Sequence, residues 1–206
     1  AVSLTSGVEA IASAFPVLWS YRVLVSLVLL AVITLINLRG VRETGSIMAI
    51  PTYLFIVVYL PMLFYGAVRA VIEGPGNLAA IAPRAVVPLT PFLVLHTFSS
   101  GCTALTGIEA ISDGVPAFRP PESRNAGRTL IVMALLMGVL FVGSIGLTRF
   151  FAVIAGPEET ILSALARRIL GGGPAYLLVQ FSTLLVLAVA ANTSFSGFPR
   201  VAVVLA

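Results

Sequence analysis

The sequence predicts an all-α membrane protein, and its composition and apolar periodicity support that prediction. Hydrophobic residues occupy 59% of the 206 positions, charged residues occupy only 10%, and the mean hydropathy is +1.09. Apolar windows of about 20 residues, the length with which a helix crosses the hydrocarbon core of a bilayer, recur along the chain. So few polar residues could not cover these windows in water. We therefore expect a chain that crosses the membrane several times.

Six helices are expected within a single transmembrane domain. They cover residues 1–15, 19–38, 47–68, 89–112, 129–148 and 175–206. Pro51 and Pro61 fall inside the third helix, which a membrane tolerates because neighbouring helices satisfy the freed backbone groups. The first helix lacks a recognisable start and the last residues stop inside an apolar run. We therefore expect an internal part of a longer, transporter-sized protein, incomplete at both ends.

The arginines are unevenly distributed among the connections. Five lie in the 25 residues of connections 38–46 and 113–128, and six lie in the 53 residues of connections 18–22, 69–90 and 149–174. Because cytoplasmic loops are enriched in basic residues, the first two connections are expected in the cytoplasm. Trp19 and Tyr21 then belong to an aromatic belt at the outer face. The net charge of +4 is thus a topology signal, and no nucleic acid partner is expected.

The fourth expected helix contains an unusually polar stretch, FSSGCTALTGIEAISDGVP at 98–116. Gly101 can end a first half helix, because glycine readily adopts the left-handed conformation. Thr106 and Glu109 have the spacing of a capping box, which starts a new helix. The helix is therefore predicted to be broken at 101–106. Unpaired backbone groups at membrane depth cost several kcal/mol each, so such breaks are typical of positions where those groups line a substrate or ion site.

Residues around the break form the candidate substrate or ion site, namely Gly101, Cys102, Thr106 and Gly107. Glu109 is the candidate coupling residue, since acids at membrane depth are usually functional, although Glu109 and Thr106 could serve only as helix caps. Cys102 cannot form an internal disulfide and could be a small apolar packing residue. His96 is either a hydrogen-bonded packing residue or a proton carrier.

A second polar stretch lies in the last expected helix, at 191–199. It contains Asn192, Ser194 and Ser196. Such small and polar residues either pack helices against one another or form a second lining of the same cavity, and the sequence leaves both open. We expect no metal site and no cofactor.

Three segments together resemble a known family of permeases. They are INLRGVRETG at 36–45, SSGCTALTGIEAISDGVPAFRPPESRNAGRTL at 99–130 and AANTSFSGFP at 190–199. The resemblance, which covers essentially the whole chain, is to the amino acid, polyamine and organocation (APC) superfamily. It is strongest to the branch of high-affinity bacterial potassium importers related to the KUP uptake systems. It implies a LeuT-like inverted-repeat scaffold of about twelve helices, of which this chain covers late helix 3 to helix 8, with the broken helix as helix 6.

The same resemblance implies roles for individual residues. Ser3 and Thr106 correspond to potassium-contacting oxygens, and Glu109 corresponds to an acid linked to coupling. The implied function is proton-coupled potassium import across the bacterial cytoplasmic membrane by a multi-pass protein. The alternative is an amino acid permease driven by protons or another cation.

Functions from other classes are weaker interpretations of the sequence. A membrane-embedded enzyme would show clustered histidines and acids within the membrane, and a non-transporting assembly subunit would not need a broken helix with a capped restart. The expected partners are thus a potassium ion or an amino acid, a coupling proton and the lipid bilayer. Whether two copies form a homodimer is left open.

Overall fold

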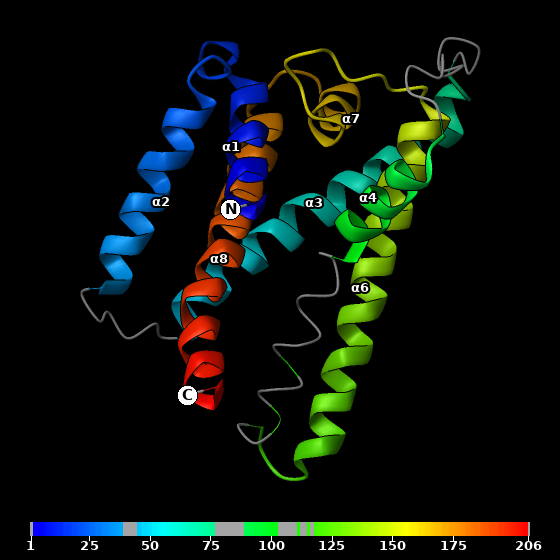
Figure 1. The fold of residues 1–206 in the computed structure, drawn as a ribbon. Helices are drawn as coiled ribbons and strands as arrows, with labels where there is room; N and C mark the ends of the chain where they lie inside the picture. Colours follow the sequence, from blue (N-terminus) through cyan, green and yellow to red (C-terminus); the bar gives the residue numbers. More distant parts are fainter. Residues whose placement is uncertain are drawn as a thin grey trace. The chain divides into compact units, whose positions relative to one another are not determined.

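The computed structural model describes residues 2–38, 45–76, 89–102, 111, 115 and 118–205, and it describes no side chain at 45–47, 100 or 193–205. Its elements within these ranges are all helices (Figure 1), which confirms the predicted all-α class. The chain divides into two compact units, Ala1–Ile81 with Ser144–Ala206 and Ala82–Gly143. Each unit is described by itself.

The larger unit is built around two helices that lie side by side. They are α1 (Val2–Ala14) and α8 (Pro174–Leu205). Helix α2 (Arg22–Leu38) contacts the other side of α1, and α3 (Gly45–Glu73) crosses α8 (Figure 1). The last residues of α6 (Glu122–Phe150) and the short helix α7 (Ile161–Leu170) complete this unit.

Small residues allow α1 and α8 to approach closely. Leu4, Val8 and Ala12, spaced by four residues on one face of α1, are each at most 2% exposed. A Cβ atom at Gly7 would lie only 3.2 Å from the Leu187 Cβ atom. A larger residue at Gly7 would push the helices apart, as is common at interfaces between membrane helices.

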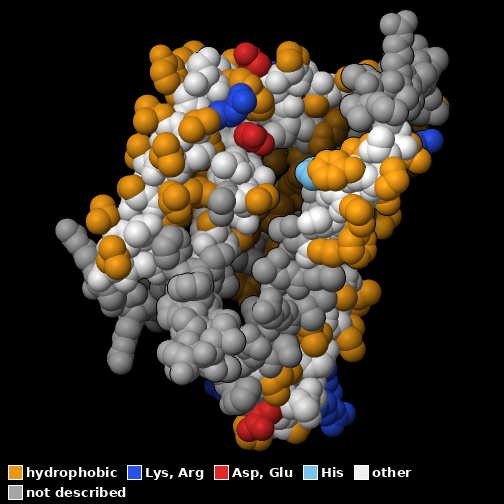
Figure 2. All heavy atoms as spheres, viewed as in Figure 1, with side chains coloured by type: hydrophobic (Ala, Val, Ile, Leu, Met, Phe, Trp, Pro, Cys, Tyr) orange, Lys and Arg blue, Asp and Glu red, His pale blue; other side chains and the backbone are white. Residues whose placement is uncertain are grey.

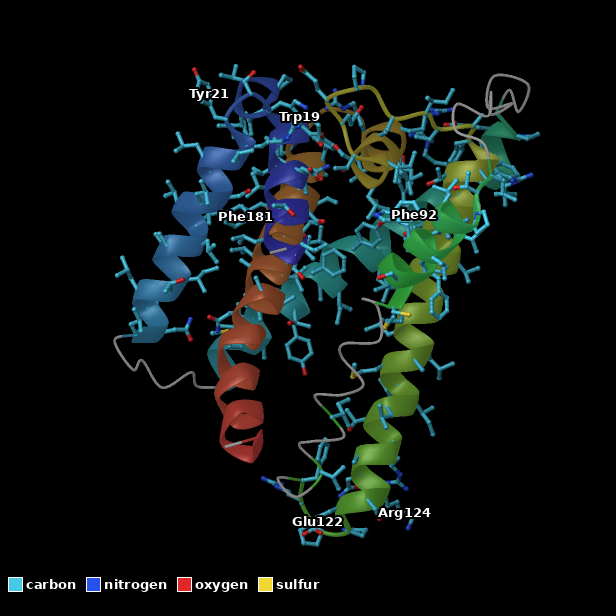
Figure 3. The ribbon with its side chains drawn as sticks, in the orientation of Figure 1. Trp19, Tyr21, Phe92, Glu122, Arg124 and Phe181 are labelled. Atoms are coloured by element: carbon cyan, nitrogen blue, oxygen red, sulfur yellow. The ribbon has the colours of Figure 1, made fainter. Side chains whose placement is uncertain are left out.

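A tight turn joins α1 to α2. Phe15 ends α1, and Pro16 starts the 3₁₀-helix η1 (Pro16–Leu18), where proline is favoured because its missing N–H is not needed. The Arg22 guanidinium lies 5.1 Å from the centre of the Trp19 ring. Figure 3 shows Trp19 and Tyr21 at this turn, which is where the sequence predicts the outer aromatic belt.

Three described helices are long and apolar enough to cross a membrane, with spans at Met48–Glu73, Glu122–Phe150 and Pro174–Asn192. Helix α2 is a shorter apolar helix with no buried residue among its 17. Apolar side chains dominate its visible surface in Figure 2. Such a surface is stable against lipid tails and costly in water.

The observed helices extend beyond several of the expected ranges. Helix α3 contains Pro51 and Pro61 and continues to Glu73, and α6 begins at Glu122, seven residues before the expected start at Thr129. The start of α6 is polar, and composition alone assigned it to the loop. Residues 161–170, which were expected to belong to the connection 149–174, form a separate amphipathic helix, α7.

The smaller unit contains α4 (Pro91–Cys102) and α6 up to Gly143. The Thr90 hydroxyl accepts a hydrogen bond from the Leu93 amide at 3.2 Å, so Thr90 and Pro91 start α4 with a side-chain cap followed by a proline. Figure 3 labels Phe92 in the first turn of α4. Glu122 lies in the first turn of α6, where an acid favours the positive end of the helix dipole.

Candidate functional site

The predicted break in the fourth helix lies largely outside the described residues. Gly101 and Cys102 are the last two residues of α4, and both are exposed. Thr106, Gly107 and Glu109 lie outside the described residues. The broken helix and the roles of these residues therefore stay predictions. His96 lies on α4 with its ring centre 6.4 Å from that of Phe92.

Ser3 and Asn192 lie at a similar level of the α1–α8 pair. Helices α1 and α8 are antiparallel, because Gly7 faces Leu187 while Ser13, further along α1, contacts Tyr176. Ser3, four residues before Gly7, is then level with about residue 191, since both helices rise equally per residue. Ser3 is half-buried and Asn192 is buried. Two of the predicted site residues thus share one level of the unit.

Asn192 also joins α8 to α2. The Asn37 side-chain amide donates to the Asn192 side-chain oxygen at 2.6 Å, close to the end of α2. This hydrogen bond agrees with the interpretation of 191–199 as a packing segment. Ser194 and Ser196 lie on α8, but their side chains are outside the described residues, so a second lining there stays a prediction.

A buried polar cluster fixes α7 to α1 and α8. The Tyr176 hydroxyl lies 2.7 Å from the Ser163 hydroxyl and donates to the Ser13 carbonyl at 3.2 Å. Gln180 donates to the Ser163 hydroxyl at 2.9 Å. Ser13, Ser163, Tyr176 and Gln180 are each at most 3% exposed. Since buried polar groups are costly unless paired, this cluster specifies one position for α7.

Arg167 extends that cluster to the surface. Its guanidinium donates to the Ser13 carbonyl at 2.8 Å and to the Tyr176 hydroxyl at 3.0 Å, and it pairs with the Glu159 carboxylate at 3.1 Å. The hydrogen bond to Tyr176 raises the pKa of Arg167 above its ordinary value. A base with a raised pKa loses its stabilising effect only as the pH rises through that value. The charge of Arg167 is therefore constant at neutral pH.

Both ends of α7 are capped. At the start, the Thr160 hydroxyl accepts from the Ser163 amide at 3.2 Å, and the Thr160 amide donates to the Ser13 hydroxyl at 3.0 Å. At the end, Gly171 has a φ of 76°, which favours glycine, and Arg69 of α3 donates to the Ile169 carbonyl at 2.6 Å. Helix α7 therefore links α1 and α8 to α3.

The contact between α3 and α7 depends on a glycine. A Cβ atom at Gly66 would lie 2.7 Å from the Ile169 Cδ1 atom and 2.9 Å from the Leu147 Cδ1 atom. Nearby, Glu73 pairs with Arg69 and, at 3.1 Å, with Arg168. These ion pairs are partly exposed, so their contribution to stability is small. Close packing at Gly66 is the more specific link.

A cavity of about 220 Å³ lies beside α1 in the larger unit. Its wall is mostly apolar, and its polar lining comes from four segments: Ser6, Glu9, Tyr59, Thr160, Gln180 and Thr183. The Tyr59 hydroxyl lies 2.9 Å from the Ser144 hydroxyl. The cavity thus brings hydroxyl, amide and carboxylate groups together.

Sequence reasoning missed this cavity. Its polar residues are isolated single positions in apolar helices far apart in the chain, so no local motif marks them. The only available signal was the spacing of Ser3, Ser6 and Glu9, three residues apart on α1, which places them on neighbouring turns of one helix. Among the described residues, no group of three histidines, cysteines or acids could hold a metal ion.

Comparisons with known proteins agree with this architecture. The sequence model of the amino acid permease family matches residues 1–206. The chain is 43% identical over 205 residues to the potassium transporter KimA of Bacillus subtilis (strain 168), which covers 98% of this chain and 34% of that protein. The chain thus spans about a third of the length of the curated relative that it matches.

Long apolar helices identify a helical membrane protein, and a cavity with a few polar groups between such helices is typical of membrane transport proteins. The chain belongs to the amino acid permease family, within the APC superfamily, and is related to a potassium transporter. The predicted resemblance is therefore confirmed. The family is one of transporters, which excludes the interpretation as an enzyme.

Proposed function

We propose that the intact protein containing this chain imports potassium across the bacterial cytoplasmic membrane as a multi-pass, proton-coupled secondary transporter. The observation that carries the proposal is the 43% identity to a potassium transporter over nearly the whole chain. At that identity, the relative's bacterial source also supports a bacterial membrane for this protein.

The chemistry of the described residues fits a monovalent cation. Ser3 places a hydroxyl on α1, at the level of the buried Asn192 carbonyl on α8. Neutral oxygens of this kind can replace the hydration shell of potassium. The family resemblance implies further oxygens, from the Thr106 hydroxyl and from carbonyls at the predicted helix break, as in the ion sites of such scaffolds.

Amino acid transport is the second candidate function. It is favoured by the name of the matching family, amino acid permease. A helix break offers free amides to a carboxylate and free carbonyls to an ammonium group, so the predicted break would suit either substrate.

Transport by the intact purified protein separates the two candidates. We would reconstitute it into liposomes, impose a proton gradient, and compare uptake of radioactive rubidium, a potassium mimic, with uptake of a labelled amino acid mixture. Rubidium uptake that collapses when the gradient is dissipated is the expected result. Amino acid uptake without rubidium uptake would overturn the proposal in favour of the second candidate.

A further inference from the structure

Glu9 is an acid that does not belong to the predicted substrate or ion site. It lies on α1, is partly buried, and lines the 220 Å³ cavity described above. Across the described residues, no hydrogen bond or ion pair joins its carboxylate to another side chain. Two other acids of this unit are paired, the exposed Glu73 with Arg69 and the partly buried Glu159 with Arg167. The Glu9 carboxylate thus has no hydrogen-bond or ion-pair partner among the described side chains.

The cavity offers oxygen atoms around that charge. Ser6 lies one turn before Glu9, and Thr183 and Gln180 contribute from α8. The described residues that line the cavity include no lysine and no arginine. Glu9 also lines a second groove, between α1 and α2, together with Arg22, whose guanidinium stacks on Trp19. A cation entering the cavity would therefore meet an acid and neutral oxygens, with no lysine or arginine in the described lining of the cavity.

Glu9 and Ser6 also lie in line with a predicted site residue. Ser3, Ser6 and Glu9 follow at intervals of three residues on α1, so Glu9 is about 9 Å from Ser3 along the helix axis. Glu9 is nearer the turn at Trp19, which the arginine distribution predicts to lie outside. An ion arriving from that side would pass Glu9 before it reaches the level of Ser3 and Asn192.

We propose that this cavity is an outer binding site for an alkali cation, in which Glu9 supplies the charge and the oxygens of Ser6, Gln180 and Thr183 replace part of the hydration shell. The inference rests on the proposed cation transport. A carboxylate against a mostly apolar wall is costly without a counter-ion, so the same acid that attracts the cation is stabilised by it. The site raises the local cation concentration before the ion moves inward.

The test compares Glu9→Gln with the wild-type intact protein in liposomes, measuring the initial rate of rubidium uptake against external rubidium. We expect the half-saturating concentration to rise on the order of threefold to tenfold, because one steering charge is lost, with a smaller change in the maximal rate. Glu158→Gln is the matched control, since it removes an exposed acid of the same predicted side that does not line the cavity. That control should behave as wild type.

The outcomes separate the inference from the proposed function. Glu9→Gln with wild-type half-saturation, or an equal rise in Glu158→Gln, would overturn the cation site while leaving potassium transport in place. If the wild type takes up no rubidium, the proposed function fails, and equilibrium binding of rubidium to the detergent-purified protein decides the inference. Binding that Glu9→Gln weakens and Glu9→Asp largely retains would support the site, and binding that does not depend on Glu9 would overturn it.

Discussion

The role of a single polar side chain in this protein depends on whether it has hydrogen-bond or ion-pair partners. Ser13 is almost fully buried, yet its hydroxyl accepts from the Thr160 amide and its carbonyl accepts from Arg167 and Tyr176. One turn earlier on the same helix, the Glu9 carbonyl accepts from the Ser13 hydroxyl at 2.7 Å, but the Glu9 carboxylate has no hydrogen-bond or ion-pair partner among the described residues. The contrast indicates that Ser13 has a structural role, whereas Glu9 is available to bind an ion.

At Glu109 we expect replacement by glutamine to abolish proton-coupled uptake while the protein still folds. The sequence predicts Glu109 at membrane depth, where an acid can carry a proton, and glutamine keeps its shape without that ability. The measurement is rubidium uptake by the intact variant at several pH values, with gel filtration as the test of folding. Uptake equal to wild type at every pH would reduce Glu109 to a helix cap.

At Thr106 we expect replacement by valine to weaken substrate affinity more than it lowers the maximal rate. Valine has the same shape but no hydroxyl, so a lost oxygen contact raises the half-saturating concentration. A loss of about 1 kcal/mol corresponds to roughly a fivefold rise. A half-saturating rubidium concentration equal to that of the wild type would place the binding oxygens elsewhere.

At the level of elements, α7 connects helices that are far apart in the sequence. It contacts α1 and α8 through the cluster around Tyr176 and contacts α3 through Arg69 and the close packing at Gly66. A helix of only ten residues is not stable alone in water. Its stability therefore comes from these contacts, and its position depends on them.

The Tyr176→Phe variant should loosen the attachment of α7. It removes the hydroxyl that contacts Ser163, Arg167 and the Ser13 carbonyl, and leaving such buried groups with fewer partners costs about 1–3 kcal/mol. We expect a lower Tm for the intact protein in detergent. Tyr53→Phe is the control, because Tyr53 is 68% exposed.

The expected decrease in Tm should be the same at every pH in the neutral range. The pKa of Arg167 is raised by Tyr176, so the arginine stays charged in the wild type, and removing the hydroxyl does not bring its titration into the range of about pH 6 to 8. A wild-type Tm for Tyr176→Phe would show that the cluster does not hold α7 in place.

At the level of the whole molecule, the described part of the chain has three helices that can span a membrane and a shorter apolar helix, α2. The side of the membrane that each connection faces is predicted from arginine density alone. That prediction decides whether Glu9 faces the outside, so it bears directly on the direction of ion entry.

Cysteine labelling tests this topology. In a Cys102→Ser background, Glu158→Cys should react with a membrane-impermeant maleimide added outside intact cells, because its connection is predicted outside. Ser123→Cys, at the start of α6, should react only after the membrane is permeabilised. Both residues are exposed, so burial does not limit either reaction. The reverse pattern would invert the topology and contradict entry past Glu9.

Much of the fold could be predicted, because its signals are local. Continuous apolar windows identified the long helices around Pro61 and Leu135, and the Gly101 and Thr106 pattern identified a candidate break. The start of α6 and the short helix α7 were assigned to loops, since their polar residues resemble loop sequence. Thr160 and Gly171 form caps for α7, but capping residues occur equally in loops, so they do not by themselves establish a helix.

The sequence by itself determined the class and the family of this protein, because hydrophobicity and contiguous motifs are properties of adjacent residues. Only the tertiary structure decided that Ser13, Ser163 and Tyr176 form one buried cluster, and that Glu9 shares a cavity with Gln180 and Thr183. Ser13 and Glu9 on α1 lie at least 150 positions from the α7 and α8 residues that they meet. Their meeting depends on the antiparallel packing of α1 against α8, whose register is set by close contacts such as Gly7 with Leu187.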